Sequence, residues 1–243
     1  MSVPLTIHPH ISKYVSKEFR HDLYSLEFDG DNDQISIPTL DLNGWTEFTA
    51  LWRIYWYADY GEVIPYIYDF GANFGHYGYY NIAGNNFWLQ LKISGVNRFL
   101  TYVFEPAFRW DMYALRWESG DFIRLYRNGV QVAISGAAHA GILNATTALP
   151  HLLGTNNTTT RTIHGRYAHF ALYNRALTVN EIYELARLSY MRLLQGAVCC
   201  LPMEEGLGVT VRDISGNGND GTLVNGPTWR RNAMWELLAE SDI

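Results

Sequence analysis

An all-β fold of short antiparallel strands, with one helix near the C-terminal end, is what this 243-residue sequence predicts. Between residues 24 and 173, short runs of alternating apolar and polar residues are separated by clusters of Gly, Asn and Asp, a pattern typical of sandwiches and barrels. Hydrophobic residues make up 48% of the chain, which is enough for one sizeable core. We therefore expect one domain over residues 23–230, between an N-terminal arm (1–22) and a C-terminal tail (231–243).

The same alternation locates the individual strands. In residues 122–134, FIRLYRNGVQVAI, two alternating runs flank Asn128 and Gly129, and both of these residues tolerate the positive φ of a two-residue turn. This pattern predicts a β-hairpin. The other expected strands are residues 24–28, 33–38, 46–56, 62–70, 87–93, 99–104, 110–117 and 164–173.

A single amphipathic helix is predicted over residues 179–195. Thr178 followed by Glu181 forms a capping box at its start, and Gly196 can end it. Its apolar face should lie against the sandwich. Strand patterns return in residues 197–229 after the helix. The residues that recur at helical spacing are Ile182, Leu185, Ala186 and Leu193.

Charge and composition exclude several classes of partner. The formal net charge is −6, so we expect no basic face for nucleic acid or for an acidic membrane surface. The first twenty residues lack the pattern of a secretory signal, and no segment has the length and apolarity of a membrane span. We expect a protein that stays in the cytoplasm or leaves the cell by another route, such as on a particle. Cys199 and Cys200 are neighbours that would point to opposite faces of a strand, so we expect free thiols.

Three segments together resemble the laminin G-like, concanavalin A-like lectin modules. They are YSLEFDGDNDQISIP (24–38), RLYRNGVQVA (124–133) and YNRALTVNEI (173–182). In those modules a Phe-Asp-Gly turn, an Asn-Gly hairpin and a Tyr-Asn-Arg-Ala-Leu strand end follow one another in this order. The resemblance implies a concanavalin A-like jelly roll, a sandwich of two antiparallel sheets.

One segment of the resemblance stands in the wrong place. Residues 201–229, LPMEEGLGVTVRDISGNGNDGTLVNGPTW, resemble the first strands of the same module, yet here they follow the helix. Circular permutation, a truncated second module, or completion of a neighbouring subunit in a homo-oligomer would each explain this order. We expect permutation, because sandwich termini commonly lie close together and a permuted chain leaves no sheet edge unpaired. Donation to a neighbour would satisfy the same hydrogen bonds between subunits, whereas a truncated module would leave apolar strands without partners.

The resemblance also implies one structural Ca²⁺. Related modules hold it with the Asp and backbone carbonyls of the Asp-x-Ser-Gly loop, helped by an acidic pair on the strand before Tyr-Asn-Arg-Ala-Leu. Ala168 and His169 occupy the positions of that pair here, and Ca²⁺ selects oxygen ligands. The alternative is that the loop's Asp and Asn side chains cap turns. If calcium binds, its candidate ligands are Asp213, Asn217 and Asp220.

Alternating carboxylates near residue 30 raise the possibility of catalysis. On a regular strand they would share one face, as the acid pair of a glycosidase does. Concanavalin A-like glycosidases resemble Glu-x-Asp-x-x-Glu, and Asn32 occupies the position of the last Glu. We expect instead that Asp29 and Gly30 begin a turn and that no catalytic residues are present. The carboxylates are Glu27, Asp29, Asp31 and Asp33.

Aromatic and short polar side chains are concentrated in residues 57–81. Aromatic faces beside short polar groups suit sugars, whose C–H faces stack while their hydroxyls form hydrogen bonds. The same composition suits a protein interface, so both ligands stay open. The candidate binding residues are Tyr57, Tyr60, Phe74, His76, Tyr77, Tyr79 and Tyr80.

These observations favour a non-catalytic, lectin-like surface-binding or adhesion module. Without an export signal, and with an arm and a tail outside the family pattern, the chain fits a virion or surface-particle protein that recognises a glycan or attaches to a protein lattice. The competing hypothesis is a glycan-active hydrolase of the same fold. Replacement of Glu27 or Asp29 would separate the two, because only the enzyme would lose turnover.

Overall fold

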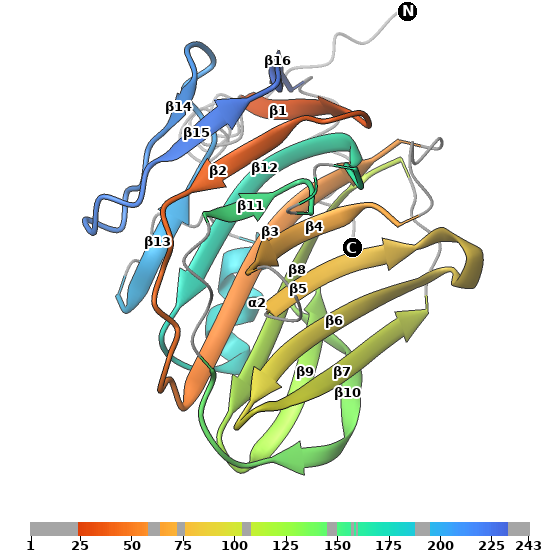
Figure 1. Ribbon diagram of the computed structural model, residues 1–243, viewed down its shortest axis with the longest axis vertical. Helices are drawn as coiled ribbons and strands as arrows, with labels where there is room; N and C mark the ends of the chain where they lie inside the picture. The colour runs from red at the N-terminus through yellow and green to blue at the C-terminus, as the bar shows by residue number, and fades with distance from the viewer. Residues whose placement is uncertain are drawn as a thin grey trace, which may run out of the picture.

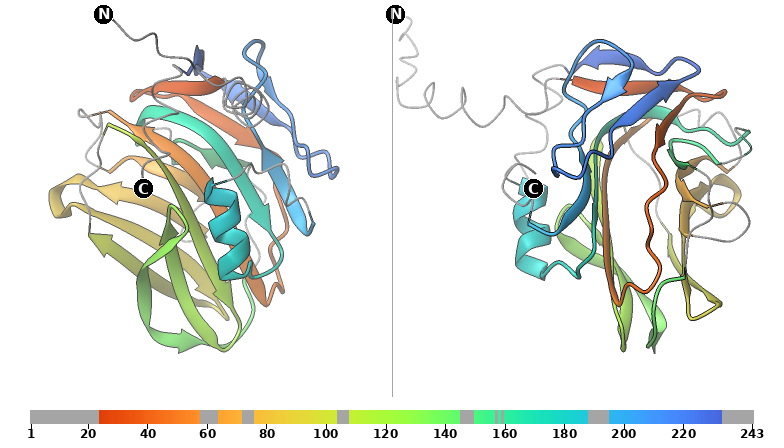
Figure 2. Two further views of the ribbon diagram at one scale, coloured as in Figure 1. Left: turned by 180° about the vertical axis from the view of Figure 1, so that it is seen from behind. Right: turned by 60° about the vertical axis from the view of Figure 1, so that its left-hand side comes forward.

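The computed structural model describes residues 24–57, 64–71, 76–103, 108–144, 150–156, 158, 160–187 and 195–232. Two eight-stranded antiparallel sheets lie face to face in this part of the chain, as the sequence predicts, and one helix packs on the outside (Figures 1 and 2). We call the sheet nearer the viewer in Figure 1 the front sheet and the other the back sheet. In the described ranges no helix is long and apolar enough to cross a bilayer.

The back sheet has the strand order β10-β9-β8-β3-β12-β1-β16, and β13 pairs with the far end of β12. Its strands are β1 (Tyr24–Asp29), β3 (Glu47–Trp56), β8 (Trp110–Glu118), β9 (Asp121–Arg127), β10 (Val130–His139), β12 (His164–Tyr173), β13 (Ala197–Leu201) and β16 (Thr228–Arg231).

The front sheet has the strand order β14-β15-β2-β11-β4-β5-β6-β7. Its strands are β2 (Gln34–Ile37), β4 (Tyr66–Phe70), β5 (His76–Asn81), β6 (Asn86–Ile93), β7 (Val96–Val103), β11 (His151–Leu153), β14 (Thr210–Val211) and β15 (Gly221–Val224), with a short 3-10 helix, η2 (Ile82–Gly84), between β5 and β6.

Aromatic side chains fill the space between the two sheets. Trp52, on the central strand β3, is fully buried and stacks on Tyr113 of the back sheet at a ring-centroid distance of 5.7 Å. Trp52 also contacts Tyr68 of the front sheet at a ring-centroid distance of 5.6 Å. Large buried aromatic rings of this kind contribute strongly to core stability because each removes much apolar surface from water.

The predicted hairpin is confirmed. Asn128 and Gly129 have φ values of 50° and 83°, which are the positive values that a tight turn between twisted strands requires. Most of the other predicted strands are confirmed within a few residues. The sequence missed β5 and β11, and it placed the start of β4 at residue 62, whereas β4 begins at Tyr66.

The amphipathic helix is α2 (Val179–Arg187), and residues 188–194 of the predicted helix lie outside the described ranges. Its capping box is confirmed: the Glu181 N–H donates to Thr178 Oγ1 at 3.2 Å, and the Thr178 N–H donates to Glu181 Oε2 at 2.7 Å. Ile182 and Leu185 are buried in a second apolar cluster on the outside of the back sheet. Figure 2 shows α2 lying across this outer face.

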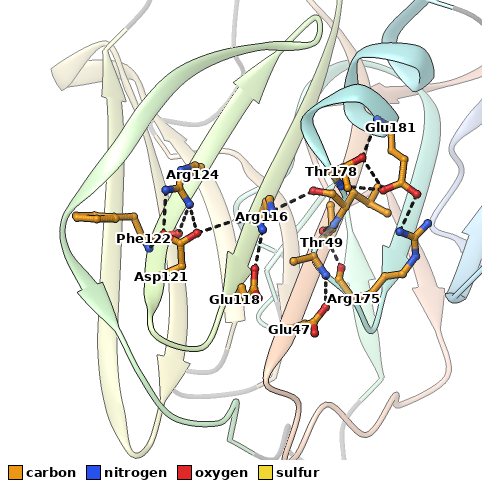
Figure 3. Close-up of polar contacts among 12 residues, drawn as sticks. Glu47, Thr49, Arg116, Glu118, Asp121, Phe122, Arg124, Arg175, Thr178 and Glu181 are labelled. Atoms are coloured by element: carbon orange, nitrogen blue, oxygen red, sulfur yellow. Dashed lines mark hydrogen bonds and ion pairs between the residues drawn. The ribbon is translucent and has the colours of Figure 1, made fainter.

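Polar contacts fix the segment that joins β12 to α2 (Figure 3). Thr49 Oγ1 donates to the Arg175 carbonyl at 2.9 Å and accepts the Leu177 N–H at 3.0 Å. Glu47 accepts the Ala176 N–H at 2.8 Å, and Arg116 Nε donates to the Leu177 carbonyl at 3.0 Å. The Tyr-Asn-Arg-Ala-Leu segment is thus fastened to β3 and β8, which sets the position of the helix.

The C-terminal strands pair with strands of the same chain. β13 pairs with β12, β15 with β2 and β16 with β1, so the displaced segment completes both sheets within one subunit. Arg231, at the end of β16, pairs with Tyr24, at the start of β1. Because β1 and β16 are antiparallel neighbours, the end of β16 lies beside the start of β1. A short connection between these two ends would give the chain order of the related modules. Circular permutation itself stays a prediction.

The two cysteines point to opposite sides of β13, as predicted. Cys199 belongs to the core between the sheets and Cys200 to the cluster under α2. Both thiols are free and buried, and burial raises the pKa of each. Both are therefore protonated and packed as small apolar groups.

Candidate functional site

Aromatic side chains from four neighbouring strands gather on the outer face of the front sheet. Tyr66 on β4 pairs directly with Tyr79 on β5, and Tyr79 pairs with Trp88 on β6. Phe99 on β7 extends the line through its ring contact with Trp88. We call the set Tyr66, Tyr77, Tyr79, Trp88 and Phe99 the aromatic row.

Strand alternation decides which tyrosines of β5 join the row. Tyr77 and Tyr79 point outward and are half-buried, whereas Tyr80 is 0% exposed and His76 is 1% exposed. Gly78 also points inward, where a Cβ would lie 2.7 Å from the Tyr68 ring. The predicted binding residues His76 and Tyr80 therefore pack in the core, and their side chains do not reach the outer surface.

Three pairs of neighbouring rings in the row are stacked, and Phe99 is not part of that stack. Tyr66 and Tyr79 are 5.2 Å apart with an interplanar angle of 27°, and Tyr79 and Trp88 are 6.3 Å apart at 3°. Tyr77 lies beside Tyr79 at 5.8 Å and 19°. Phe99 is 45% exposed and meets Trp88 edge to face at 5.9 Å. The stacked rings therefore cover part of one another's faces, and the parts left exposed form a continuous aromatic surface with Phe99 at its end.

Polar groups orient and flank these rings. Trp88 Nε1 donates to Asn86 Oδ1 at 3.0 Å, which holds the indole in place. The Arg161 guanidinium lies 6.0 Å from the Tyr66 ring, within the range of a cation–π contact. Burial and the neighbouring Tyr66 raise the pKa of Tyr77 to about 12, so its hydroxyl stays neutral and able to donate.

Tyr57 belongs to a different surface. It directly follows β3 in the back sheet, where its hydroxyl donates to Glu27 Oε1 at 2.8 Å and its ring contacts His164 at 5.1 Å. Arg230 of β16 also donates to Glu27. The hydrogen bonds from Arg230 and Tyr57 outweigh the effect of burial and lower the pKa of Glu27. Two other predicted residues, Tyr60 and Phe74, lie outside the described ranges.

The predicted turn at Asp29 and Gly30 is confirmed. β1 ends at Asp29, whose Oδ1 accepts the Asp31 N–H at 2.9 Å, and Asp33 Oδ2 accepts the Asp29 N–H at 3.0 Å. The strand alternation thus stops before Asp31, and no regular face of four carboxylates forms. Asp33 is only 2% exposed, and its pKa is raised to about 6, chiefly by burial. A cleft of about 270 Å³ beside the turn is lined by Glu27, Phe28, Asp29, Asp33, His164, Gly226, Thr228 and Arg230.

The polar side chains of the Asp-Ile-Ser-Gly loop form hydrogen bonds with the backbone of the loop and of β13. Asp213 Oδ1 accepts the Cys200 N–H at 2.8 Å, and its Oδ2 accepts the Asn219 N–H at 2.9 Å. Asp220 Oδ1 accepts the Asp213 N–H at 2.7 Å, while Asn217 Nδ2 donates to backbone carbonyls of β13. Within the described ranges, no three His, Cys, Asp or Glu residues are grouped as metal ligands. These contacts are the ones expected of side chains that cap turns, and calcium binding stays a prediction.

Three members of the row were missed by the sequence analysis: Tyr66, Trp88 and Phe99. The signal for Trp88 was present, because residues 86–93 alternate and Trp88 falls in the polar register with Asn86, Gln90 and Lys92. An aromatic residue on the polar side of an alternating strand indicates an exposed ring. Tyr66 and Phe99 could be found only from the strand pairing.

The two facing sheets, the external helix α2 and the Asn-Gly hairpin define a concanavalin A-like jelly roll. A family described as the concanavalin A-like lectin/glucanases superfamily matches residues 29–183. That range is more than half of the chain, and the protein belongs to this superfamily. The match ends before β13, so the four C-terminal strands lie beyond it. No curated protein sequence matches the chain at a significant level.

Two solved structures show the fold. A candidate carbohydrate-binding protein from Bacteroides ovatus ATCC 8483 is 17% identical, with a TM-score of 0.66, and the alignment covers 86% of this chain and 60% of that protein. The chain thus spans about three fifths of that relative's length. The native heptameric SAP-like pentraxin of Limulus polyphemus is 13% identical, with a TM-score of 0.56. The alignment covers 88% of this chain and 97% of the pentraxin chain. At these identities the likeness establishes architecture alone.

Proposed function

We propose that the protein is a non-catalytic carbohydrate-binding module and that the aromatic row is its binding surface. The observation that carries the proposal is the set of aligned rings on the outer face of the front sheet, with Tyr66, Tyr79 and Trp88 nearly parallel. The superfamily includes lectins, and one structural neighbour is a candidate carbohydrate-binding protein, which supports the same ligand class.

Sugar binding follows from the chemistry of this surface. The C–H face of a pyranose stacks on an aromatic face, while its hydroxyls need directed donors and acceptors. Amide groups stand beside the rings, since Asn81 pairs with Asn86 across β5 and β6 and both are partly exposed. Because the rings lie on paired strands, their positions are held by the sheet, and binding would require little ordering.

The hydrolase is the weaker hypothesis on these observations. Glu27 is bound by Tyr57 and Arg230, and Asp33 is almost fully buried at the turn between β1 and β2. Neither residue belongs to the aromatic row. A glycosidase needs two carboxyl groups positioned on either side of a bound glycosidic bond. The proposal therefore assigns no catalytic role to Glu27, Asp29 or Asp33.

Saturable binding to immobilised polysaccharides tests the proposal. The Trp88→Ala variant should lose retention, and Tyr183→Ala, which removes a 45% exposed ring from α2 on the opposite side, is the matched control. Product release from the same polysaccharides, abolished by Glu27→Gln in a folded protein, would favour the hydrolase. If the polysaccharides retain Trp88→Ala as strongly as wild type, the aromatic row is not the binding site.

Attachment to a virion or other particle, and homo-oligomerisation, stay predictions based on the sequence. The arm and nearly all of the tail that motivate them lie outside the described ranges. Fractionation of the source material tests both predictions. We expect the protein in the particle fraction, and a soluble monomer absent from particles would contradict both predictions.

A further inference from the structure

The aromatic row crosses the strands and reaches the edge of its sheet. It begins at Tyr66 on β4, continues through Tyr79 and Trp88, and ends with Phe99 on β7, which is the last strand of the front sheet. No described strand pairs with the outer side of β7. The ring contacts run from β4 to that edge without a break, each pair of neighbours lying 5.2–6.3 Å apart.

This shape differs from a pocket for a single sugar. A pocket surrounds one sugar and needs walls, whereas the members of this row lie side by side on four neighbouring strands. The edge residues Phe99 and Val103 are 45% and 70% exposed, so described side chains do not wall off this end. A ligand that uses the whole row must be extended, and it can continue past β7.

The polar groups beside the row are mostly uncharged. Asn81 and Asn86 project from the same outer face of β5 and β6, and Thr101 lies directly across from Trp88. Gln90 shares their register but is 0% exposed. The charged side chains near the row do not form a line. Arg161 contacts Tyr66 at the β4 end, Lys92 shares the outward register of Trp88 on β6, and Asp69, which pairs with Tyr77, is only 7% exposed. Amides and hydroxyls recognise sugar hydroxyls, and a polyanionic chain would need a line of cationic side chains instead.

Building on the proposed function, we infer that the row binds internal segments of a linear, unbranched, neutral polysaccharide laid across strands β4 to β7. Several consecutive sugars contact the row at once. Because every contact adds to the others, affinity grows with the length of the oligosaccharide until the row is covered. The chain end makes no required contact, so its chemical state does not matter.

Isothermal calorimetry with the full chain and β-1,4-linked gluco-, xylo- and manno-oligosaccharides, from monosaccharide to hexasaccharide, tests this inference. We expect affinity to rise at least about tenfold from disaccharide to tetrasaccharide in one series, the size of one good ring contact. Reduction of the terminal sugar should leave the affinity for the hexasaccharide unchanged. A change of salt concentration should have little effect.

Phe99→Ala is the informative variant, because Phe99 lies at one end of the row. It should weaken binding of the hexasaccharide and leave the disaccharide unaffected, while Tyr183→Ala changes neither. Equal affinity for mono- and hexasaccharide, loss of binding on end modification, or tighter binding of polyuronate than of neutral chains would overturn the inference and leave carbohydrate binding intact. If no glycan binds and the aromatic row binds a partner protein instead, the proposed function is overturned as well.

Discussion

The two outer faces of the sandwich carry aromatic residues in opposite circumstances. On the back sheet, outward side chains such as Leu51 and Tyr126 are buried under α2, and polar contacts fasten the segment that delivers the helix. On the front sheet, Tyr79 and Trp88 are half-buried and Phe99 is 45% exposed. Apolar surface under a helix contributes to folding, whereas apolar surface left in water in a contiguous row indicates a binding face.

The largest loss of stability is expected on the outer face of the back sheet, which α2 covers. Ile182→Ala removes a fully buried side chain from the contact between α2 and the back sheet. We expect the free energy of unfolding to fall by about 2–5 kcal/mol. Chemical denaturation measures this change, and glycan affinity measured below the transition should equal that of wild type. A loss of affinity in the folded variant would mean that the two faces are not independent.

Acid should destabilise the protein through two buried histidines beneath the front sheet. Burial lowers the pKa of His76 and of His151 to about 4. His76 Nδ1 accepts the Lys92 N–H at 3.2 Å and Nε2 donates to the Asn144 carbonyl at 3.3 Å, a neutral arrangement. Because the unfolded chain binds protons at a higher pH, this stability is present above about pH 6.5 and is lost as the pH falls toward 4, by roughly 3 kcal/mol for each histidine.

His76→Gln is the control for this pH dependence. The amide of Gln can accept one hydrogen bond and donate the other without titrating. The loss of stability between pH 6.5 and pH 4 should be smaller in the variant than in wild type. Asp33 acts in the opposite direction, since burial raises its pKa to about 6 and its stabilising effect disappears as the pH rises through that value. An unchanged pH profile in His76→Gln would show that His76 is not responsible.

Substitutions in the aromatic row on the front sheet should reduce glycan affinity more than they reduce the stability of the fold. Trp88→Ala removes a half-buried ring that stacks on Tyr79, so we expect a loss of glycan affinity of at least about tenfold. Trp88→Phe, which keeps a ring but loses the bond to Asn86, should show an intermediate loss. Calorimetry gives both affinities, and circular dichroism confirms that the variants are folded. Equal losses in the Ala and Phe variants would point to the indole hydrogen bond instead of stacking.

A smaller effect is expected at the start of the helix on the covered face. Thr178→Ala removes the side chain that accepts the Glu181 N–H and should lower the free energy of unfolding by about 1 kcal/mol. Thr178→Ser keeps the hydroxyl and should behave nearly as wild type. Denaturation midpoints compare the three proteins, and identical midpoints for Thr178→Ala and wild type would show that the cap is not needed.

The smallest expected effect concerns calcium. Both oxygens of Asp213 already accept backbone N–H groups, so added Ca²⁺ or a chelator should leave the melting temperature within about 1 °C. A saturable rise with Ca²⁺ that disappears in Asp213→Asn would establish the calcium site implied by the family resemblance.

Local chemistry made the turns and the helix start predictable, while the binding face depended on information between strands. Asn128 and Gly129 are sufficient to specify the hairpin turn, and Thr178 and Glu181 are sufficient to specify the start of the helix. For the segment around Tyr79 and Tyr80, the sequence does not separate core residues from surface residues. Tyr suits both a core and a surface, so alternation alone leaves open which of two neighbours faces outward, and only pairing with Trp88 and Phe87 on β6 decides it.

Nuclear magnetic resonance of the tryptophan indole N–H groups tests the central claim most directly, because the chain carries internal references. Trp88 lies on the front face, Trp52 in the core and Trp110 on the back sheet. Titration with a β-1,4-linked hexasaccharide should shift the Trp88 signal, identified by its loss in Trp88→Phe, in a saturable manner while the Trp52 and Trp110 signals stay in place. Saturable binding that shifts Trp110 and leaves Trp88 unchanged would contradict the account.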